Sequence, residues 1–368
     1  MAVYKLFPTQ DTTLYSIYPE MNTGLDEILE ASLEVGNLGT PAPQTSRFLI
    51  QFDSTEITDV INNKISGSSW NSYLRCFVAN VTALNSTTTI EAYPISQSWN
   101  MGTGRFENIP QTQNGASWIW RDYQGGIKWT TSSFAAGTTG SYSSSVSPGG
   151  GTWYTSVSAS QSFNYYTDKD INLLTSGIIT TWYSGTLPNN GFIVKQQNEF
   201  MNNENTQPKM KYFSIDTHTI YPPCLEFKWI DATFNTGSST LPTININPFI
   251  VTLGENAGYF YPDSINQFRV YSRPEYPARV FATASYFTQN YYLPENSYYA
   301  IKDLDTDEYV IDFDTNYTQL SIDATSSFFT LYMEGLQPER YYKVLIKTTV
   351  DGSTMVLDND YYFKIING

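Results

Sequence analysis

Apolar and polar residues alternate in short runs along most of the chain, as they do in half-buried β-strands. The clearest run is Ser46–Asp53. One face of this run carries Phe48, Ile50 and Phe52, and the other carries Arg47, Gln51 and Asp53. A strand with so apolar a face needs a second layer to cover it. The run therefore predicts a β-sandwich organised around residues 46–53.

Further runs with the same period predict strands on both sides of this one. In the first part of the chain they are Asp11–Tyr15, Ile28–Val35, Tyr73–Asn80, Thr88–Ile95, Ile171–Leu173, Phe192–Gln196, Gln207–Phe213 and Cys224–Trp229. In the last part they are Phe268–Ser272, Val280–Ser285, Tyr298–Leu304, Phe328–Met333, Tyr341–Val350 and Tyr361–Ile366. The dipeptide Asp351-Gly352 predicts a hairpin turn between two of them. Short strands separated by turn signals indicate an all-β chain.

Helical spacing is restricted to two short segments. Asp53 has a capping-box partner in Glu56, and the apolar residues that follow share one helical face. The second segment follows Thr175 and carries Ile178, Ile179 and Trp182. Both segments predict single short helices inside a β domain.

Two shifts in composition divide the chain. From Gln97 to Thr167 the residues Gly, Ser, Thr, Asn and Trp dominate, which we interpret as strands joined by long loops at one end of a sandwich. Residues 231–242 lack periodicity and are rich in Thr, Gly, Ser and Pro, which is typical of a linker. We therefore predict one β-sandwich domain over residues 1–230 and another over residues 243–368.

Composition and charge narrow the classes of partner. The chain has 29 Tyr, 21 Phe and 8 Trp among 368 residues, which favours pleated, half-buried surfaces. Its net charge of −15 repels phosphate backbones and anionic lipids, so nucleic acid and membrane are excluded as expected partners. Cys76 and Cys224 are interpreted as buried thiols, with a disulfide as the alternative. Neither a signal peptide nor a long apolar span is recognised, so synthesis in a cytoplasm is expected.

Candidate catalytic chemistry is sparse. His218 is the one histidine of the sequence, it lies in a polar loop, and no nucleophile motif accompanies it. Carboxylates gather at Asp303, Asp305, Asp307, Glu308, Asp312 and Asp314. Such a loop suggests either a solvated acidic hairpin or a calcium site, although the EF-hand spacing is not met. We expect no catalytic residue, no cofactor and no metal.

The tryptophans at Trp99, Trp118, Trp120 and Trp129 are the candidate binding residues. Flat aromatic faces in a polar loop region can stack on sugar rings or anchor a protein interface. The same side chains can instead fill the end of the sandwich. The sequence leaves all three alternatives open, with packing favoured.

An ordered set of short motifs between about residues 8 and 215 carries a family resemblance. The set comprises Asp11-x-Thr13, Asn22-x-Gly24, the strand Arg47–Asp53, the run Ile90–Trp99, Asn190-Gly191-Phe192-Ile193 and a closing strand that starts at Pro208. In this order it resembles the disaggregatase-related, or DNRLRE-type, modules, which are relatives of a carbohydrate-binding family. The resemblance implies an N-terminal jelly-roll β-sandwich. The long segment 97–167 departs from the pattern.

A second resemblance concerns the last part of the chain. Leu336, Pro338 and Tyr342 form the spacing Leu-x-Pro-x-x-x-Tyr. This resembles the tyrosine corner of fibronectin type III domains and related sandwiches, where the tyrosine hydroxyl bonds back to nearby backbone. The core tryptophan of those domains is missing, because the last tryptophan of the chain is Trp229. The resemblance therefore implies a C-terminal immunoglobulin-like β-sandwich.

The stretch from Met1 to Thr12, together with the chain through Tyr221-Pro222-Pro223, resembles virion structural proteins of cyanophage-type marine myoviruses. This resemblance implies a non-enzymatic structural subunit of a tailed bacteriophage virion, assembled in the host cytoplasm. An accessory or adaptor role in the tail or baseplate is expected, with other virion proteins or a second copy of the chain as partners. The alternative is a carbohydrate-binding module that attaches to host glycan from a virion appendage or the head.

Overall fold

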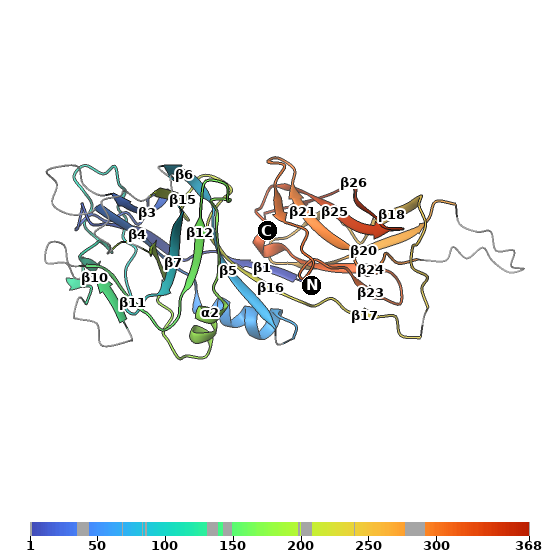
Figure 1. Ribbon diagram of the computed structural model, residues 1–368, viewed down its shortest axis with the longest axis horizontal. Coiled ribbons are helices and arrows are strands. Elements are labelled where there is room, and N and C mark those ends of the chain that lie inside the picture. Colours follow the sequence, from blue (N-terminus) through green and yellow to red (C-terminus); the bar gives the residue numbers. More distant parts are fainter. Residues whose placement is uncertain are drawn as a thin grey trace, which may run out of the picture. The chain divides into compact units, whose positions relative to one another are not determined.

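The computed structural model describes residues 2–34, 44–67, 69–82, 84, 87–130, 139–142, 149–197, 199, 208–238, 240–276 and 291–367. Strands dominate these residues, and the two α-helices are short (Figure 1). The predicted all-β fold class, with β-sandwich architecture, is confirmed. The strand predicted at Val280–Ser285 lies outside the described residues.

The chain divides into two compact units that are not consecutive in sequence. The larger unit contains residues 6–62 and 71–226. The smaller unit contains residues 63–70 and the chain from residue 227 onward, together with residues 2–5. The change between units thus falls inside the strand Cys224–Trp229, a few residues before the segment 231–242 that composition indicated as a linker.

An eight-stranded sheet forms the main layer of the larger unit. Its strands follow the order β12-β7-β14-β4-β3-β15-β6, and β2 also pairs with β4. Their bounds are β2 Gln10–Tyr15, β3 Ile28–Glu34, β4 Gln44–Gln51, β6 Val78–Thr82, β7 Thr88–Pro94, β12 Ala159–Phe163, β14 Phe192–Gln196 and β15 Lys209–Phe213. A further sheet has the order β1-β16-β5-β13, with β1 Ala2–Leu6, β5 Trp70–Cys76, β13 Ile171–Leu174 and β16 Cys224–Trp229.

The predicted strand Tyr73–Asn80 is two strands rather than one. β5 ends at Cys76 and β6 begins at Val78, so the chain changes sheets across Phe77. This corrects the prediction, because alternation alone continues through a residue at which the backbone leaves one sheet for another. Cys76 and Cys224 are both buried thiols, and neither forms a disulfide.

Both helices begin where the sequence indicates. α1 spans Ser54–Asp59, and the Asp53 carboxylate accepts hydrogen bonds from the backbone N–H groups of Thr55 and Glu56 at 2.6 and 3.1 Å. These bonds hold the pKa of Asp53 below its ordinary value. A π-helical turn, Val60–Lys64, follows α1. α2 spans Ser176–Tyr183 and buries the three apolar residues that predicted it.

Two small antiparallel strand pairs and an isolated bridge lie in the loop region of the larger unit. β8 Trp120–Asp122 pairs with β9 Ile127–Lys128, and β10 Thr139–Tyr142 pairs with β11 Gly149–Tyr154. An isolated bridge joins Ile95 to Trp153. The described part of the segment rich in Gly, Ser and Trp is therefore built of short strands and loops.

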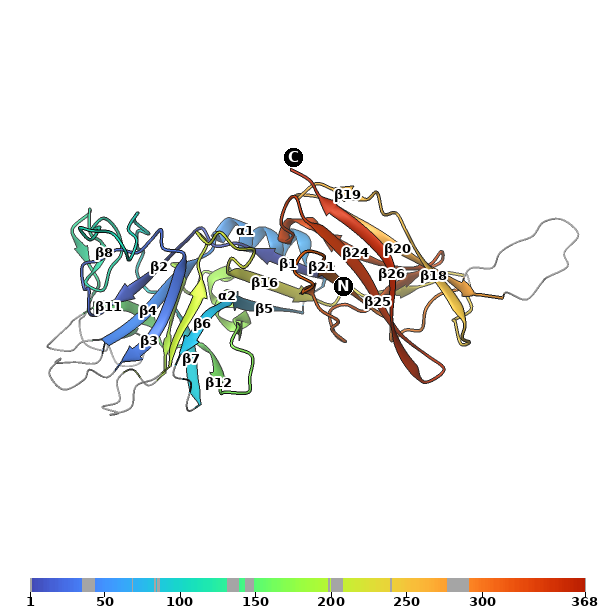
Figure 2. The ribbon, with the colours of Figure 1, turned by 90° about the horizontal axis from the view of Figure 1, so that it is seen from above.

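Two five-stranded sheets form the smaller unit (Figure 2). One has the order β17-β23-β24-β20-β18, and the other has the order β19-β26-β25-β21-β22. Their bounds are β17 Phe234–Asn235, β18 Phe249–Gly254, β19 Tyr259–Phe260, β20 Ile265–Pro274, β21 Tyr298–Asp303, β22 Tyr309–Ile311, β23 Ser321–Asp323, β24 Ser327–Tyr332, β25 Tyr341–Val350 and β26 Ser353–Ile365. A 3₁₀ turn, Met333–Gly335, follows β24.

One apolar core lies between the sheets of the smaller unit. Phe268, Phe329 and Tyr299 stack at its centre, with ring centroids 5.2 and 4.2 Å apart. The predicted hairpin joins β25 to β26, and Asp351 and Gly352 both have positive φ angles, as a two-residue type I′ turn requires. The sequence did not predict β18. In the structure this strand pairs with β20 along six residues.

Candidate functional site

Trp99, Trp118 and Trp129 lie in one apolar cluster of the larger unit. The cluster comprises Leu14, Leu49, Ile95, Trp99, Ala116, Trp118, Trp129, Trp153 and Ile193. The indole N–H of Trp99 donates to the carbonyl of Asn190 at 2.9 Å, and that of Trp129 to the carbonyl of Ser117 at 2.9 Å. Because their faces are covered, these rings pack the end of the sandwich and present no surface on which a sugar could stack.

Trp120 differs from the other three tryptophans. It is half-buried on β8, where the Lys128 ammonium lies 4.7 Å from its ring centroid. Tyr123 meets the same ring edge-on, with centroids 5.3 Å apart. Like the other three tryptophans, Trp120 therefore contacts side chains of its own chain.

The tryptophan cluster encloses the charge of Arg47. This side chain is fully buried, although the alternation of β4 assigned it to the polar face. Its Nε donates to Glu199 Oε2 at 2.9 Å, and its guanidinium carbon lies 4.9 and 5.1 Å from the ring centroids of Trp118 and Trp153. Leu49, on the same face of β4, is also buried. The second face of β4 is thus an interior face, which corrects the prediction of a polar one.

The glycine run at residues 149–151 makes room for this arrangement. Gly150 has a φ of +76°, and its carbonyl accepts a hydrogen bond from Arg47. A Cβ at Gly150 would lie 2.7 Å from Trp118 and 2.8 Å from Arg47. Any larger residue would therefore displace the guanidinium or the indole.

The predicted tyrosine corner forms in the smaller unit. Tyr342 is buried on β25, and its hydroxyl donates to the Gln337 carbonyl at 3.1 Å and accepts from the Gln337 N–H at 2.8 Å. Leu336 is buried beside Tyr342 in the core, and Pro338 follows Gln337 in the turn between the 3₁₀ helix and β25. Burial raises the pKa of the Tyr342 hydroxyl, so it remains a hydrogen-bond donor at alkaline pH values where an exposed tyrosine ionises.

Hydrogen bonds from Arg340 and from backbone amides stabilise the acidic loop after β21. The Asp303 carboxylate accepts hydrogen bonds from Arg340 Nη2 at 2.7 Å and from the backbone N–H groups of Asp305 and Thr306. Although burial acts to raise the pKa of Asp303, the Arg340 guanidinium and these amides hold it below its ordinary value. Within the described part of the chain, no group of three or more His, Cys, Asp or Glu side chains is arranged to hold a metal ion. His218 is exposed and lies 3.5 Å from a Glu27 carboxylate oxygen.

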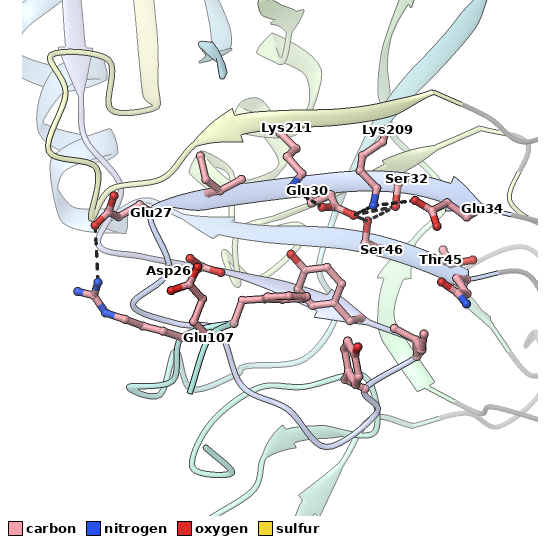
Figure 3. Close-up of a pocket in the computed structure, with 17 residues that line it drawn as sticks. Asp26, Glu27, Glu30, Ser32, Glu34, Thr45, Ser46, Glu107, Lys209 and Lys211 are labelled. Carbon is pink, nitrogen blue, oxygen red and sulfur yellow. Dashed lines mark hydrogen bonds and ion pairs between the residues drawn. The ribbon is translucent and has the colours of Figure 1, made fainter. Parts of the chain in front are cut away.

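The larger unit has an open pocket on its eight-stranded sheet, on the side away from Leu29, Ala31 and Leu33 (Figure 3). Its volume is about 630 Å³. The lining residues are Tyr15, Ile17, Tyr18, Asp26, Glu27, Ile28, Glu30, Ser32, Glu34, Gln44, Thr45, Ser46, Arg105, Phe106, Glu107, Lys209 and Lys211. None of these residues belongs to the candidates that the sequence indicated.

Strand register builds the floor of this pocket. Glu30, Ser32 and Glu34 share one face of β3, because side chains two residues apart point to the same side of a strand. Across the sheet, Lys211 on β15 lies opposite Glu30, and Ser46 on β4 lies opposite Ser32. The sequence signal was the alternation of acids with Leu29, Ala31 and Leu33, which we used only to predict a strand.

Glu30 is the centre of the floor. Its Oε1 accepts from Ser32 Oγ at 3.0 Å and Ser46 Oγ at 3.1 Å. Lys211 Nζ lies 3.5 Å from its Oε2, and Lys209 bridges it to Glu34 with Nζ–O distances of 3.7 and 2.6 Å (Figure 3). The floor is therefore a pre-formed array of hydroxyl, ammonium and carboxylate groups.

The segments before β3 and after Gly104 supply the acidic wall. Burial raises the pKa of Asp26, and the Glu107 carboxylate adds a smaller increase. The N–H groups of Phe106 and Glu27 and the Arg105 guanidinium lower it. Arg105 pairs with Glu27 at 3.6 Å. Among the ion pairs of the described residues, none includes Asp26 or Glu107.

An aromatic rim borders the acidic wall. Phe106 contacts Tyr15 and Tyr18 edge-on, with centroids 5.1 and 5.8 Å apart. Phe106 is 44% exposed and Tyr18 is 36% exposed, whereas Tyr15 is buried below them. Burial raises the pKa of the Tyr15 hydroxyl well above its ordinary value, and the carboxylates of Glu30 and Asp26 contribute.

A second buried carboxyl, Asp11 on β2, is separate from the pocket. One of its oxygens accepts the Ile215 N–H at 2.8 Å, and the other has no hydrogen-bond partner among the described residues. Burial raises its pKa to about 8, against the lowering effect of the Ile215 hydrogen bond. Its carboxyl group is therefore largely protonated at neutral pH.

Comparison with known proteins identifies no family for the chain. No family model matches the chain, and no curated protein matches it. Among solved structures, the chain is similar to the β-glucuronidase of Parabacteroides merdae at 8% identity with a TM-score of 0.17, over 96% of this chain and 36% of that one. At such values the likeness carries no argument. In the described residues, neither α-helix has the length and apolar character needed to cross a lipid bilayer.

Proposed function

We propose that this protein is a non-enzymatic structural subunit of a tailed bacteriophage virion, with an accessory or adaptor role in the tail or baseplate. The observation that carries this proposal is a set of exposed tyrosines on the smaller unit. Its exposed tyrosines, with exposed fractions between 40% and 79%, are Tyr259, Tyr261, Tyr276, Tyr309, Tyr341 and Tyr362.

Tyrosine is among the residue types that anchor protein interfaces, because its ring adds apolar area at small entropic cost while its hydroxyl bonds to polar groups. Lys364 and Lys343, which pair with Glu339 and Asp358, have their ammonium groups 5.6 and 5.4 Å from the ring centroids of Tyr341 and Tyr362. These charged groups would supply a polar rim. Rigid sandwiches with such surfaces suit stable contacts in a particle, where an interface buries more than about 1,000 Å².

Mass spectrometry of purified phage particles, with stoichiometry, before and after the tails are separated from the heads, tests the proposal. We expect the protein at a fixed copy number in the tail fraction. Recovery in the head fraction would replace the tail role by a decoration or neck role. Absence from the particles would overturn the virion proposal.

A second candidate function, carbohydrate binding by a virion appendage, is favoured by the pocket of the larger unit. Exposed rings of Phe106 and Tyr18 beside a floor of hydroxyl, ammonium and carboxylate groups combine the two kinds of contact that sugars make. The test is a glycan array with the full chain. A uniformly blank array would remove this candidate and leave the first untouched.

A further inference from the structure

We propose that the pocket between β2, β3, β4, β15 and the loop at residues 105–107 binds a glycan segment of neutral or amino sugars and rejects acidic sugars. This inference rests on the second candidate function. It assigns the binding site and the ligand class, neither of which follows from the sequence.

The pocket has a suitable size and shape. Its volume of about 630 Å³ lies inside the range of roughly 300–1,000 Å³ found for small-molecule sites. Its floor is a rigid sheet surface, because β3 is paired with β4 on one side and with β15 on the other. A site on paired strands holds its polar groups in fixed positions, which lowers the entropy cost of binding.

The aromatic rim provides a stacking surface. Phe106 is packed edge-on against Tyr15 and Tyr18, so its orientation is fixed while nearly half of it stays exposed. The C–H face of a pyranose is apolar and packs against such a ring, and its hydroxyls then face the polar floor. This geometry differs from that of Trp118, whose ring is fully covered.

The charge of the pocket determines which sugars it accepts. Five carboxylates line it, from Asp26, Glu27, Glu30, Glu34 and Glu107, against three cations, from Arg105, Lys209 and Lys211. Each of these cations already has a carboxylate within 4.0 Å. A uronate or sulfate group would therefore meet a net negative wall whose cations are occupied.

Asp26 and Glu107 add a preference within the accepted class. Both side chains line the pocket, and neither belongs to an ion pair of the described residues. A ligand ammonium beside either carboxylate would form charge-assisted hydrogen bonds with it. Amino sugars are thus expected to bind more tightly than their N-acetylated forms.

Calorimetry with the full chain and three oligosaccharides of equal length tests this inference: glucosamine, N-acetylglucosamine and a polyuronate. We expect binding that is at least threefold tighter for the glucosamine oligomer than for the acetylated one, and no heat with the polyuronate. Phe106→Ala should weaken both interactions at least tenfold. Tyr166→Ala, which removes a ring that is 93% exposed on the same unit and outside the pocket, is the matched control and should change neither.

A paired variant, Asp26→Asn with Glu107→Gln, tests the ligand preference separately from the stacking surface. It should abolish the advantage of the glucosamine oligomer and leave binding of the acetylated oligomer within about twofold. Melting curves of each variant establish that it is folded. If Phe106→Ala does not fold, Tyr18→Ala replaces it as the stacking test.

Three outcomes would overturn the inference. Tighter binding of the polyuronate would refute the ligand class while retaining a glycan-binding function. Glycan binding that neither pocket variant alters would place the site elsewhere. Absence of heat with all three oligomers would refute the ligand class and the pocket together, whereas the virion proposal is decided independently by particle composition.

Discussion

The tryptophan cluster around Arg47 and the pocket around Glu30 use the same kinds of residue with opposite results. Both lie in the larger unit, and both place charged groups beside aromatic rings. In the cluster, the Arg47–Glu199 pair is fully buried and the rings are covered. In the pocket, Lys211 is 37% exposed and Phe106 is 44% exposed. Exposure, and not composition, separates a packed end of the sandwich from a surface able to bind.

This difference has an energetic basis. A buried ion pair offsets its own desolvation only when both partners are present, so each partner is indispensable to the fold. An exposed pair contributes little, because water screens it and solvates either partner alone. Substitutions in the cluster should therefore change stability, whereas substitutions in the pocket should change binding.

The largest loss of stability is expected for Arg47→Met. The substitution keeps much of the side-chain volume but leaves the Glu199 carboxylate buried beside Trp118 and Trp153 without its cation. We expect the free energy of unfolding to fall by about 3–5 kcal/mol. Urea denaturation followed by tryptophan fluorescence measures it. A loss below about 1 kcal/mol would mean that the buried pair does not hold the cluster together.

Asp11→Asn tests a buried carboxyl that lacks a cation. The pKa of Asp11 is about 8 in the folded protein and 3.8 in the unfolded chain. Between these values the unfolded chain releases the proton and the folded protein keeps it, so this group makes stability fall as pH rises, by about 1.4 kcal/mol per pH unit. Above pH 8 the contribution is constant.

The neutral amide removes that dependence. Wild type and Asp11→Asn should have similar stability at pH 4, and the variant should be the more stable of the two at pH 8. The measurement is the difference between their melting temperatures at each pH. A difference that does not vary with pH would show that Asp11 is ionised in the folded protein.

An intermediate loss of stability is expected at the tyrosine corner, where the Tyr342 ring is buried and its hydroxyl both donates and accepts a hydrogen bond. Tyr342→Phe removes both hydrogen bonds to Gln337 and should cost about 1–2 kcal/mol of unfolding free energy. Tyr341→Phe is the matched control on the same strand, because Tyr341 is 50% exposed. Equal losses for the two variants would argue against a specific contribution from the corner.

The smallest effect is expected for Lys211→Met in the pocket. Its ion pair with Glu30 at 3.5 Å is partly open to water, and Ser32 and Ser46 still donate to the carboxylate after the substitution. Unfolding free energy should change by less than about 1 kcal/mol in the same urea assay. A loss as large as that of Arg47→Met would erase the distinction between the two regions.

Much of the fold was predictable from local signals. Alternation located β2, β3, β4 and β7, and the Asp53 cap located α1, because these features depend on neighbours in sequence. The break at Phe77 and the burial of Arg47 were not predictable. Both depend on which distant segment covers a given face of a strand. Arg47, for example, is in contact with Trp118, Gly150, Trp153 and Glu199, which lie far from it in sequence.

The pocket was missed for a related reason. Its floor requires the register that sets Lys211 opposite Glu30 and Ser46 opposite Ser32, and register between strands far apart in sequence cannot be read from either strand. The tyrosine corner was predictable because Leu336, Pro338 and Tyr342 are neighbours in the chain. The tryptophans, in contrast, look the same in sequence whether they are covered or exposed.

The early place of β1 in the chain has a consequence for folding during synthesis. Val3 belongs to the core of the smaller unit, Tyr4 packs on Tyr332, and Lys5 donates to the carbonyl of Val310. Residues 2–5 therefore leave the ribosome more than 200 residues before the strands that complete their core. The larger unit can fold as it emerges, while the smaller one must wait for the ribosome to release its last strand, and its first apolar residues need protection until then.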